Sequence, residues 1–345
     1  MIHRPSVETA GTIARHFGIE GNVDPVAGGH INESFRVEGG GRTLLLQWIN
    51  PEVFSRPDFV ADNVECVLDH LAGKDPEGGW PTLAKAADGS RRVQDEHGLW
   101  RALTWLPDRV QLERPGSPAT AEIGARAFGH FAALLSDLDP TRLKPIMPGF
   151  HDLATRLTAF DTALAKAPEQ RREQAAALLE MVAVDREAHR IPSATGTQRV
   201  IHGDTKFANL LFKADRSAAI AVDYDTVMPG ALWMDFGDLL RSAASIGAED
   251  DPHGGRIQDD MLRAATQGYR ETLAHAWAEA PSLAPAPARM AFMLGVRFLT
   301  DFLNGDRYFR VQGPRQNLDR AQHQLGLALE LAARADSIME ALLSP

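Results

Sequence analysis

The first hundred residues mix short alternating runs with longer runs of helical period, a pattern that predicts a sheet with accompanying helices. Gly28 and Gly29 precede an alternating run, which is typical of a turn that enters a strand. Gly39-Gly40-Gly41 then indicates a hairpin turn. In chain order the predicted elements are a helix at residues 7–18, strands at 26–37 and 43–47, a helix at 58–72, and strands around Val93 and at Trp100–Trp105.

The pattern becomes mainly helical after residue 119, and a short connector, Leu106-Pro107-Asp108, separates the two parts. One strand–loop–strand block, Val200–Val222, interrupts the helical part. We therefore predict an α+β protein with a protein-kinase-like bilobal fold: a small β-rich N-lobe at 1–105, a larger, mostly helical C-lobe at 106–345, and a nucleotide between them. The predicted C-lobe helices are Ala119–Leu138, Asp152–Ala165, Glu173–Arg190, Ile257–Ala280, Ala288–Leu303 and Asn317–Leu343.

Composition excludes some classes of binding partner but says little about the fold. The 345 residues carry a formal net charge of -10, which disfavours general affinity for nucleic acid or anionic membranes. No apolar run approaches the roughly 20 residues of a membrane-spanning helix, and the N-terminal residues lack a signal peptide's apolar region. A single cysteine, Cys66, cannot form an internal disulfide. We expect a monomer of the reducing cytoplasm whose partners are small molecules.

The segment Val200–Phe212 carries the most informative chemical pattern. It places Asp204, Lys206 and Asn209 between apolar residues, as in a kinase catalytic loop, where the acid accepts the acceptor hydroxyl's proton and the amide holds a metal. Asp223 ends the next predicted strand and is expected to bind the same Mg²⁺, which prefers oxygen ligands. Lys206 can reach the γ-phosphate as a point charge. The alternatives are a turn-capping aspartate, an asparagine that bonds its own loop, and a solvated lysine.

A literal kinase metal motif, Asp235-Phe236-Gly237, occurs 31 residues after the predicted base. It begins a predicted helix, whereas Asp223 follows the catalytic loop directly. We therefore assign the metal to Asp223, and we assign Asp235 and Asp238 to helix capping or to hydrogen bonds that hold the catalytic loop. His202 is interpreted in the same way, as a structural residue of the loop.

The nucleotide site is less well marked. Gly28 and Gly29 permit close approach of the backbone to phosphate, although a glycine pair alone is a weak signal. The strand after the hairpin lacks the lysine that pairs with ATP phosphates in protein kinases. Two substitutes stay open: Gln47 replaces the lysine by hydrogen bonding, or Arg42 supplies the charge from nearby. No Gly-x-x-x-x-Gly-Lys-Ser/Thr motif occurs, which disfavours a P-loop kinase.

These motifs resemble the aminoglycoside phosphotransferase and choline kinase superfamily, and more narrowly the N-acetylhexosamine 1-kinase group, over nearly the whole chain. In that group a glutamine is usual where this chain has Gln47. The segments that carry the resemblance are Gly29–Phe35, Leu46–Asn50, His202–Lys206, Asp223–Gly230, Asp235–Asp238 and Arg297–Phe309.

The resemblance implies ATP- and Mg²⁺-dependent phosphorylation of a hexose or N-acetylhexosamine at its anomeric hydroxyl, with Asp204 as the base. It also implies that Asn32 helps to bind the nucleotide. Arginine and histidine donate hydrogen bonds to hydroxyl or acetamide oxygens, and tyrosine can stack on a sugar face. We expect Asn304-Gly305-Asp306 to end a helix and to fold the following tyrosine back. The residues expected to hold the sugar are His30, Arg297 and Tyr308, for which plain structural roles are the alternative.

Two other functions stay open. A kinase of another hydroxylated small molecule, such as an amino sugar, an aminoglycoside or an amino alcohol, would need several acids for a cationic acceptor, and Asp225 and Asp238 are available. A pseudokinase that only binds nucleotide is disfavoured, because Asp204, Asn209 and Asp223 are all present.

Overall fold

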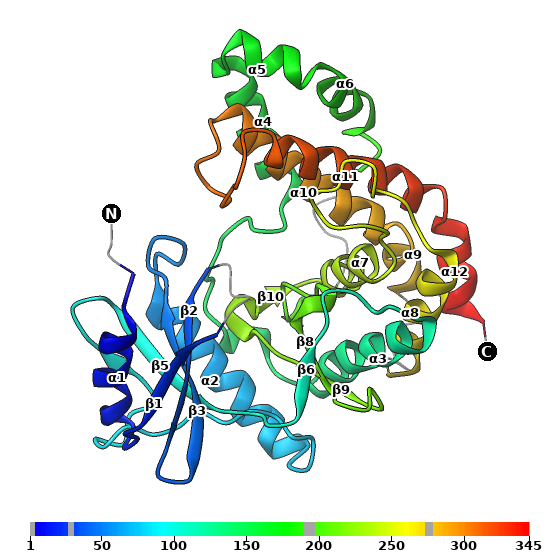
Figure 1. Cartoon of the computed structure of the whole chain (residues 1–345). Coiled ribbons are helices and arrows are strands. Elements are labelled where there is room, and N and C mark those ends of the chain that lie inside the picture. The colour runs from blue at the N-terminus through cyan, green and yellow to red at the C-terminus, as the bar shows by residue number, and fades with distance from the viewer. Residues whose placement is uncertain (1–3, 27–30, 190–196, 273–278, 345) are drawn as a thin grey trace. The chain divides into compact units, whose positions relative to one another are not determined.

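The computed structural model divides the chain into two compact units, which are described separately here (Figure 1). Unit 1 comprises Met1–Arg109, Leu134–Met147 and Tyr224–Pro229, and unit 2 comprises Val110–Ala133, Pro148–Asp223 and Gly230–Pro345. Unit 1 is rich in strands and unit 2 is mostly helical, which confirms the predicted α+β class. The structure describes all residues except 1–3, 27–30, 190–196, 273–278 and 345.

Unit 1 is built on a five-stranded antiparallel sheet in the order β1-β2-β3-β5-β4. The predicted hairpin turn joins β2 to β3, where Gly40 and Gly41 have φ angles of 57° and 74°, a region that favours glycine. Strand β1 was not predicted, because its four residues are largely exposed and show no apolar alternation. The strands are β1 Asn22–Pro25, β2 Glu33–Gly39, β3 Arg42–Ile49, β4 Val93–Gln94 and β5 Leu99–Thr104.

The two faces of this sheet differ in character. Alternate positions of β2, β3 and β5 bury large apolar side chains in a core shared with helix α1 (Val7–His16). The residues in between point to the other face, where Ser34, Gln47 and Arg101 lie opposite one another on neighbouring strands. The apolar core therefore fixes the position of a polar row. Its main side chains are Phe35, Val37, Leu44, Leu46, Trp48 and Trp100.

Helix α2 (Pro57–Lys74) joins two later segments of the chain to unit 1. The buried Asn63 donates from Nδ2 to the carbonyl oxygens of Lys144 and Val227, at 2.9 and 3.0 Å. Its Oδ1 accepts the Lys144 N–H at 2.7 Å. One amide thus holds both segments, which include the 3₁₀ turns η1 (Pro140–Arg142) and η3 (Tyr224–Thr226). The sequence placed both segments in the C-lobe, because nothing local reveals a partner so far away in the chain.

Unit 2 is organised around a long buried helix, α10, which contacts α11, α7 and α4 (Figure 1). Two glycines allow the close approach: a Cβ at Gly237 would lie 2.6 Å from the Ala286 carbonyl oxygen, and one at Gly295 would lie 2.8 Å from Leu325. Its helices are α3 Pro118–Leu134, α4 Leu153–Lys166, α5 Glu169–Gln174, α6 Ala176–Asp185, α7 Leu232–Ala243, α8 Asp259–Thr272, α9 Ala280–Leu283, α10 Ala286–Leu303, α11 Gln316–Ala332 and α12 Ala335–Leu343. Its shorter elements are β7 Arg199–Ile201, η2 Phe207–Asn209, β8 Leu210–Lys213 and β9 Ala219–Ala221, while β6 Arg109–Gln111 and β10 Met228–Gly230 each include residues assigned to both units.

Two predicted helices are each divided in the structure. The helix expected at Glu173–Arg190 is replaced by α5 and α6, which meet at Ala175. The helix expected at Asn317–Leu343 consists of α11 and α12, separated at Ala333 and Arg334. Neither break is marked by a proline or a glycine, so the local sequence does not reveal where each predicted helix is divided. Part of the helix expected at Ile257–Ala280 lies outside the described residues.

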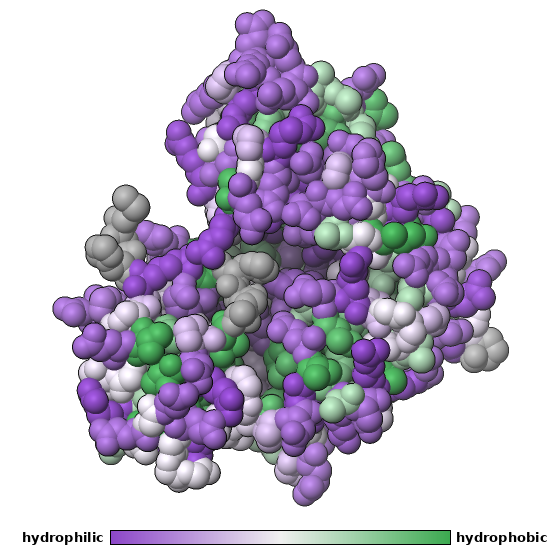
Figure 2. Space-filling view, viewed as in Figure 1, coloured by the Kyte–Doolittle hydropathy of each residue, from purple (hydrophilic) through white to green (hydrophobic). Residues whose placement is uncertain are grey.

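The exposed surface is polar where the helices carry charge. Helix α5 has no buried residue, and Figure 2 shows mainly hydrophilic residues over it at the top of the view. Across the described ranges, no helix combines the length and the apolar character that spanning a bilayer requires.

Candidate active site

The predicted catalytic loop lies between β7 and β8 and is held from α7. The backbone N–H groups of His202 and Gly203 donate to the two carboxylate oxygens of the buried Asp235, at 2.7 and 2.8 Å. The Thr205 hydroxyl donates to the Asp235 carbonyl oxygen at 2.5 Å, and Ser242 of α7 accepts the Phe207 N–H at 2.9 Å. Asp235 therefore holds the loop by hydrogen bonds, as expected for a structural residue.

Asp204 projects from this loop with its two carboxylate oxygens in different surroundings. Its Oδ2 accepts from Lys206 Nζ at 2.8 Å and from Asn209 Nδ2 at 2.9 Å. No described residue donates a hydrogen bond to Oδ1, and the side chain is 28% exposed. One oxygen is therefore fixed by the loop while the other is available to an incoming hydroxyl.

The charges of the loop stabilise one another. Burial raises the pKa of Asp204, but Lys206 and the Asn209 amide outweigh it and lower that pKa to about 2. Burial lowers the pKa of Lys206, while Asp204 and then Asp223 raise it well above its usual value. Both groups are therefore ionised near neutral pH. A carboxylate that stays ionised can accept a hydrogen bond from a hydroxyl and orient it.

Asn209 and Asp223 form a pair of oxygen donors beside the loop. The Asn209 amide nitrogen donates to Asp204, which leaves Oδ1 as a donor atom for a cation. The Val222 N–H donates to the Asn209 carbonyl oxygen at 2.9 Å and so holds the exposed Asp223 next to it. Asp223 has a φ of 68°, a left-handed conformation that aspartate tolerates better than most residues.

This donor set fits a hard divalent cation. Within the described ranges, no group of three or more His, Cys, Asp or Glu side chains could hold a metal ion. A cation at Asn209 and Asp223 would therefore complete its coordination with water and phosphate oxygens, which is how Mg²⁺ binds at phosphoryl-transfer sites. The roles of both residues stay predictions.

Arg297 of α10, one of the predicted sugar residues, contacts a cluster of aromatic side chains. The guanidinium carbon of Arg297 lies 4.8 Å from the ring centroid of Phe150 and 5.5 Å from that of Phe309. Arg156 lies over Phe150 as well, at 5.9 Å. Burial lowers the pKa of Arg297, whereas Tyr308 and Asp204 raise it, so these groups are within electrostatic reach. The arginines form a positively charged, aromatic-lined region near Asp204.

Tyr308 is brought back toward Arg297 by the turn that ends α10, as predicted. The helix ends at Leu303, and Gly305 and Asp306 adopt φ angles of 92° and 59°. The buried Asp301 then accepts the N–H groups of three successive residues, Arg307, Tyr308 and Phe309, at 2.8 to 2.9 Å. The Tyr308 side chain is 57% exposed. Asp301 was not predicted, because its partners lie beyond the turn.

Two further residues near Asp204 were not foreseen as part of the site. His151 donates from Nε2 to the Gly203 carbonyl oxygen at 2.8 Å, and its burial lowers its pKa to about 4. Arg241 of α7 donates to Asp238 Oδ1 from Nε at 2.8 Å and from Nη2 at 2.6 Å. Asp238, Arg297 and Asp204 all influence the pKa of His151, which places these charges around one centre in unit 2.

Unit 1 holds a second polar cluster. Gln47 Oε1 accepts from Arg101 Nε and Nη2 at 3.1 and 2.9 Å, and Gln47 Nε2 donates to Ser34 Oγ at 3.2 Å. Arg101 also forms an ion pair with Asp225, whose other oxygen accepts from Asn32. The cation beside Gln47 is thus Arg101, whose only sequence signal is a charge within the apolar run Leu99–Thr104.

The other predicted nucleotide residues are placed differently. Arg42 is exposed at the hairpin end of β3, and five residues of strand, about 16 Å, separate it from Gln47. The two therefore do not serve the same phosphate group. Asn32 is buried and accepts the Asn50 N–H at 2.9 Å in addition to its bond with Asp225. Gly28, Gly29 and His30 lie outside the described residues.

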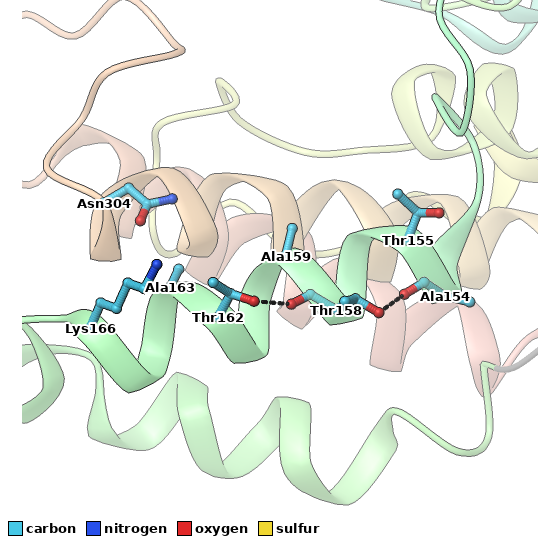
Figure 3. A pocket seen from close by; sticks show the side chains of 8 residues that line it. All are labelled: Ala154, Thr155, Thr158, Ala159, Thr162, Ala163, Lys166 and Asn304. Carbon is cyan, nitrogen blue, oxygen red and sulfur yellow. Dashed lines mark hydrogen bonds between the residues drawn. The ribbon is translucent and has the colours of Figure 1, made fainter.

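A pocket of about 610 Å³ lies along α4, apart from the catalytic loop. Figure 3 shows Thr155, Thr158 and Thr162 along this helix, with Asn304 across from it. The hydroxyls of Thr158 and Thr162 donate to carbonyl oxygens of their own helix, each at 2.9 Å. Its eight lining residues include no acid, so it offers no base or metal ligand for phosphoryl transfer.

Comparison with known proteins agrees with this geometry. The family described as the phosphotransferase enzyme family, APH, matches residues 22–293. An aminoglycoside phosphotransferase from Alicyclobacillus acidocaldarius has a similar structure, with a TM-score of 0.62, 15% identity, and coverage of 99% of this chain and 97% of that chain. Spectinomycin phosphotransferase APH(9)-Ia, in complex with ADP and spectinomycin, has a TM-score of 0.62, 10% identity, and coverage of 95% and 98%.

A third similar structure is the amicoumacin kinase hAmiN in complex with AMP-PNP, Ca²⁺ and Ami, with a TM-score of 0.61, 13% identity and coverage of 92% of each chain. These likenesses confirm the protein-kinase-like fold. The family match bears out the resemblance to the superfamily, whereas the narrower resemblance to the N-acetylhexosamine 1-kinase group stays a prediction.

Proposed function

The chain belongs to the phosphotransferase enzyme family, and from that premise we propose that it is an ATP- and Mg²⁺-dependent kinase of the anomeric hydroxyl of a hexose or N-acetylhexosamine. Family membership carries the coarser statement, transfer of phosphate to a hydroxyl group of a small molecule. The finer statement rests on the surroundings of Asp204 in unit 2.

The observation that carries the sugar proposal is the positive, aromatic-lined region near Asp204. Arg297 and Arg156 both lie over the Phe150 ring, and Arg297 also contacts Phe309. Guanidinium groups donate hydrogen bonds to hydroxyl and acetamide oxygens, and aromatic rings pack against sugar faces. A neutral, oxygen-rich acceptor suits this region, whereas a polycationic acceptor would be repelled by it.

The alternative is a kinase of an aminoglycoside, amino sugar or amino alcohol. Spectinomycin, the ligand named for spectinomycin phosphotransferase, supports this alternative. The acids that such an acceptor would require are already engaged: Asp225 pairs with Arg101 and Asn32, and Asp238 pairs with Arg241. Each of these two carboxylates is paired with an arginine, so neither offers an unbalanced negative charge to a cationic substrate. This supports a sugar over a cationic acceptor.

The remaining parts of the reaction follow from named residues. Asp204 Oδ1 would accept the hydrogen bond of the acceptor hydroxyl and take its proton as the phosphate is transferred. Lys206 would donate to the γ-phosphate, and Asn209 and Asp223 would hold Mg²⁺, which neutralises charge on the phosphates. The ADP and AMP-PNP with Ca²⁺ named for the two similar kinases support a nucleotide and a divalent cation. Within unit 1, Gln47 with Arg101 would contact the nucleotide.

An acceptor screen tests this proposal. ATP consumption would be measured with free hexoses, 2-acetamido hexoses, aminoglycosides and amino alcohols at equal concentration. We expect turnover with a hexose or an N-acetylhexosamine that exceeds turnover with the cationic acceptors by at least about tenfold. Turnover confined to aminoglycosides or amino alcohols would replace the sugar proposal with the alternative.

A further inference from the structure

His151 is a buried side chain beside the catalytic loop that has no role in the proposed reaction. It lies in the segment before α4, next to Phe150, and 8% of it is exposed. Its Nε2 is 2.8 Å from the carbonyl oxygen of Gly203, the residue directly before Asp204. A carbonyl oxygen only accepts hydrogen bonds, so Nε2 must carry the proton and donate it. Burial keeps the ring neutral by lowering its pKa to about 4.

Gly203, the residue before Asp204, is held through both its backbone N–H and its carbonyl oxygen. The Gly203 N–H donates to Asp235 at 2.8 Å, and the Gly203 carbonyl accepts from His151. Gly203 has a φ of 80°, so the chain turns at this residue. Its carbonyl belongs to the peptide group that continues into Asp204. Fixing that group fixes the direction in which the Asp204 side chain leaves the backbone.

A comparison with another buried histidine separates this role from ordinary packing. His323 is 2% exposed, and both of its nitrogens are paired, Nε2 with Ser245 Oγ at 2.9 Å and Nδ1 with the Asp251 carbonyl oxygen at 3.0 Å. In contrast, His151 Nδ1 is buried without a hydrogen-bond partner among the described residues. Leaving such an atom unpaired is unfavourable, because it gives up its hydrogen bond to water. The His151 ring is therefore oriented so that Nε2 bonds to Gly203, although this orientation leaves Nδ1 unpaired.

We propose that His151 is a positioning residue of the phosphoryl transfer: its Nε2–H fixes the Gly203 carbonyl and thereby aims Asp204 at the acceptor hydroxyl. The proposal rests on the proposed function in one respect, that Asp204 is the base. The guanidinium group of Arg297 lies over the ring of the neighbouring Phe150. Two adjacent residues of one segment would therefore orient the base and a residue predicted to bind the sugar.

The side-chain amides of glutamine and asparagine test the geometry. A glutamine amide nitrogen occupies nearly the position of histidine Nε2, whereas an asparagine amide is one carbon shorter and does not reach Gly203. With ATP, Mg²⁺ and N-acetylglucosamine, we expect His151→Gln to keep kcat within about threefold. His151→Asn and His151→Phe should lower kcat by about 10- to 100-fold, because small misplacements of a reacting group cost about that much. The KM for ATP should stay unchanged in all three variants.

His323→Phe is the matched control: it should lower the melting temperature while the folded enzyme keeps its kcat. A double-mutant cycle gives a readout that a merely structural role would not move. In the Asp204→Asn background, His151→Asn should change turnover by less than about twofold, because the aimed group is already gone. Equal kcat for His151→Asn and His151→Gln, or an undiminished His151→Asn effect in the Asp204→Asn background, would overturn the proposal.

Failure of this inference and failure of the proposed function have different signatures. If Asp204→Asn keeps full turnover, Asp204 is not the base and the premise fails. If Asp204→Asn loses turnover while the His151 variants do not, only the positioning role fails. If N-acetylglucosamine is not an acceptor, the same variants are compared in the acceptor-independent hydrolysis of ATP, where the same order of rates is expected and a different order contradicts the proposal.

Discussion

Two ion pairs between an aspartate and a basic residue, Arg101–Asp225 in unit 1 and Lys206–Asp204 in unit 2, differ in solvent exposure. In unit 1, the Arg101 and Asp225 side chains are 2% and 7% exposed. In unit 2, the Lys206 and Asp204 side chains are 32% and 28% exposed. Asp225 has both oxygens occupied, by Arg101 and by Asn32, whereas both hydrogen bonds of Asp204 end on Oδ2.

The difference fits the proposal that Asp204 and Lys206, and not Arg101 and Asp225, take part in the reaction. The position of a buried pair whose two carboxylate oxygens are both occupied is set by the surrounding fold, and breaking the pair leaves a charge without compensation. A partly exposed pair contributes little to stability, but it keeps an oxygen and a cation accessible to substrates. We call Lys206–Asp204 the open pair and Arg101–Asp225 the closed pair. We therefore expect substitutions at the open pair to change turnover, and substitutions at the closed pair to change stability.

The largest effect on turnover is expected from Asp223→Ala, which removes the only carboxylate of the proposed metal pair and should abolish Mg²⁺-dependent activity. Asp215→Ala, an exposed aspartate on the turn between β8 and β9, is the control and should leave activity unchanged. Asp235→Ala should instead lower stability, since two buried N–H groups lose their acceptor at about 1–3 kcal/mol each. An Asp235→Ala protein that folds normally but loses Mg²⁺ dependence, while Asp223→Ala keeps it, would contradict the assignment.

The next effect is that of Asp204→Asn. A positioned acid or base contributes about 10²–10⁴-fold, so kcat should fall by that factor while the Kd for nucleotide stays nearly unchanged. Asp225→Asn is the comparison in the closed pair and should act on stability more than on kcat. Steady-state kinetics and nucleotide titration measure both. Turnover of the Asp204→Asn variant within about a factor of three of wild type would remove Asp204 from the mechanism.

The closed pair can be broken from its cationic side. Arg101→Met leaves Asp225 buried and unpaired, which should lower the free energy of unfolding by about 3–5 kcal/mol. The matched variant Lys206→Met breaks the exposed pair and should change the free energy of unfolding by no more than about 1 kcal/mol. Urea denaturation measures both values. Similar losses for the two variants would mean that exposure does not distinguish the pairs.

A smaller effect concerns the sugar, with both ion pairs left in place. Arg297→Ala should raise the KM for the sugar by about tenfold or more, because a site built to hydrogen-bond a group loses affinity when one partner is removed. Tyr308→Phe should act in the same direction but less, since Tyr308 is 57% exposed. The KM for ATP should not change. A rise in the KM for ATP alone would assign Arg297 to the nucleotide.

The smallest effect is the pH dependence of stability at the open pair. The pKa of Asp204 is about 2 in the folded protein, below the value of 3.8 for an ordinary aspartate. A lowered pKa contributes stability that is present above pH 3.8 and is lost as the pH falls through about 2. The melting-temperature difference between wild type and Asp204→Asn should therefore be constant above about pH 4 and shrink toward pH 2. A difference that grows on acidification would show that the pKa is raised.

The proposed reactive centre could be predicted from the sequence because its residues are close in the chain. Asp204, Lys206 and Asn209 lie within six residues, and Asp223 follows at the end of the next hairpin. Spacing and residue type suffice where loop geometry is local. The alternation of β2, β3 and β5 likewise gave the sheet, since burial of one face imposes a period of two.

The residues that support this centre escaped prediction because their partners are distant. Arg101 meets Asp225 across 124 residues, and His151 meets Gly203 across 52. Asn63 holds segments 81 and 164 residues away. Arg101 carried a weak signal, a charge inside an apolar strand, while a histidine in a connecting segment carried none. Such contacts depend on how the elements pack, which the local pattern does not contain.

The measurement that tests the central claim most directly is the position of the phosphate. Purified enzyme with ATP and Mg²⁺ would be given N-acetylglucosamine or its methyl glycoside, and the products examined by ³¹P and ¹H NMR. We expect a product from the free sugar whose phosphorus couples to the anomeric proton, and no product from the methyl glycoside, in which the anomeric oxygen is blocked. Efficient phosphorylation of the methyl glycoside would contradict it and move the transfer to another hydroxyl.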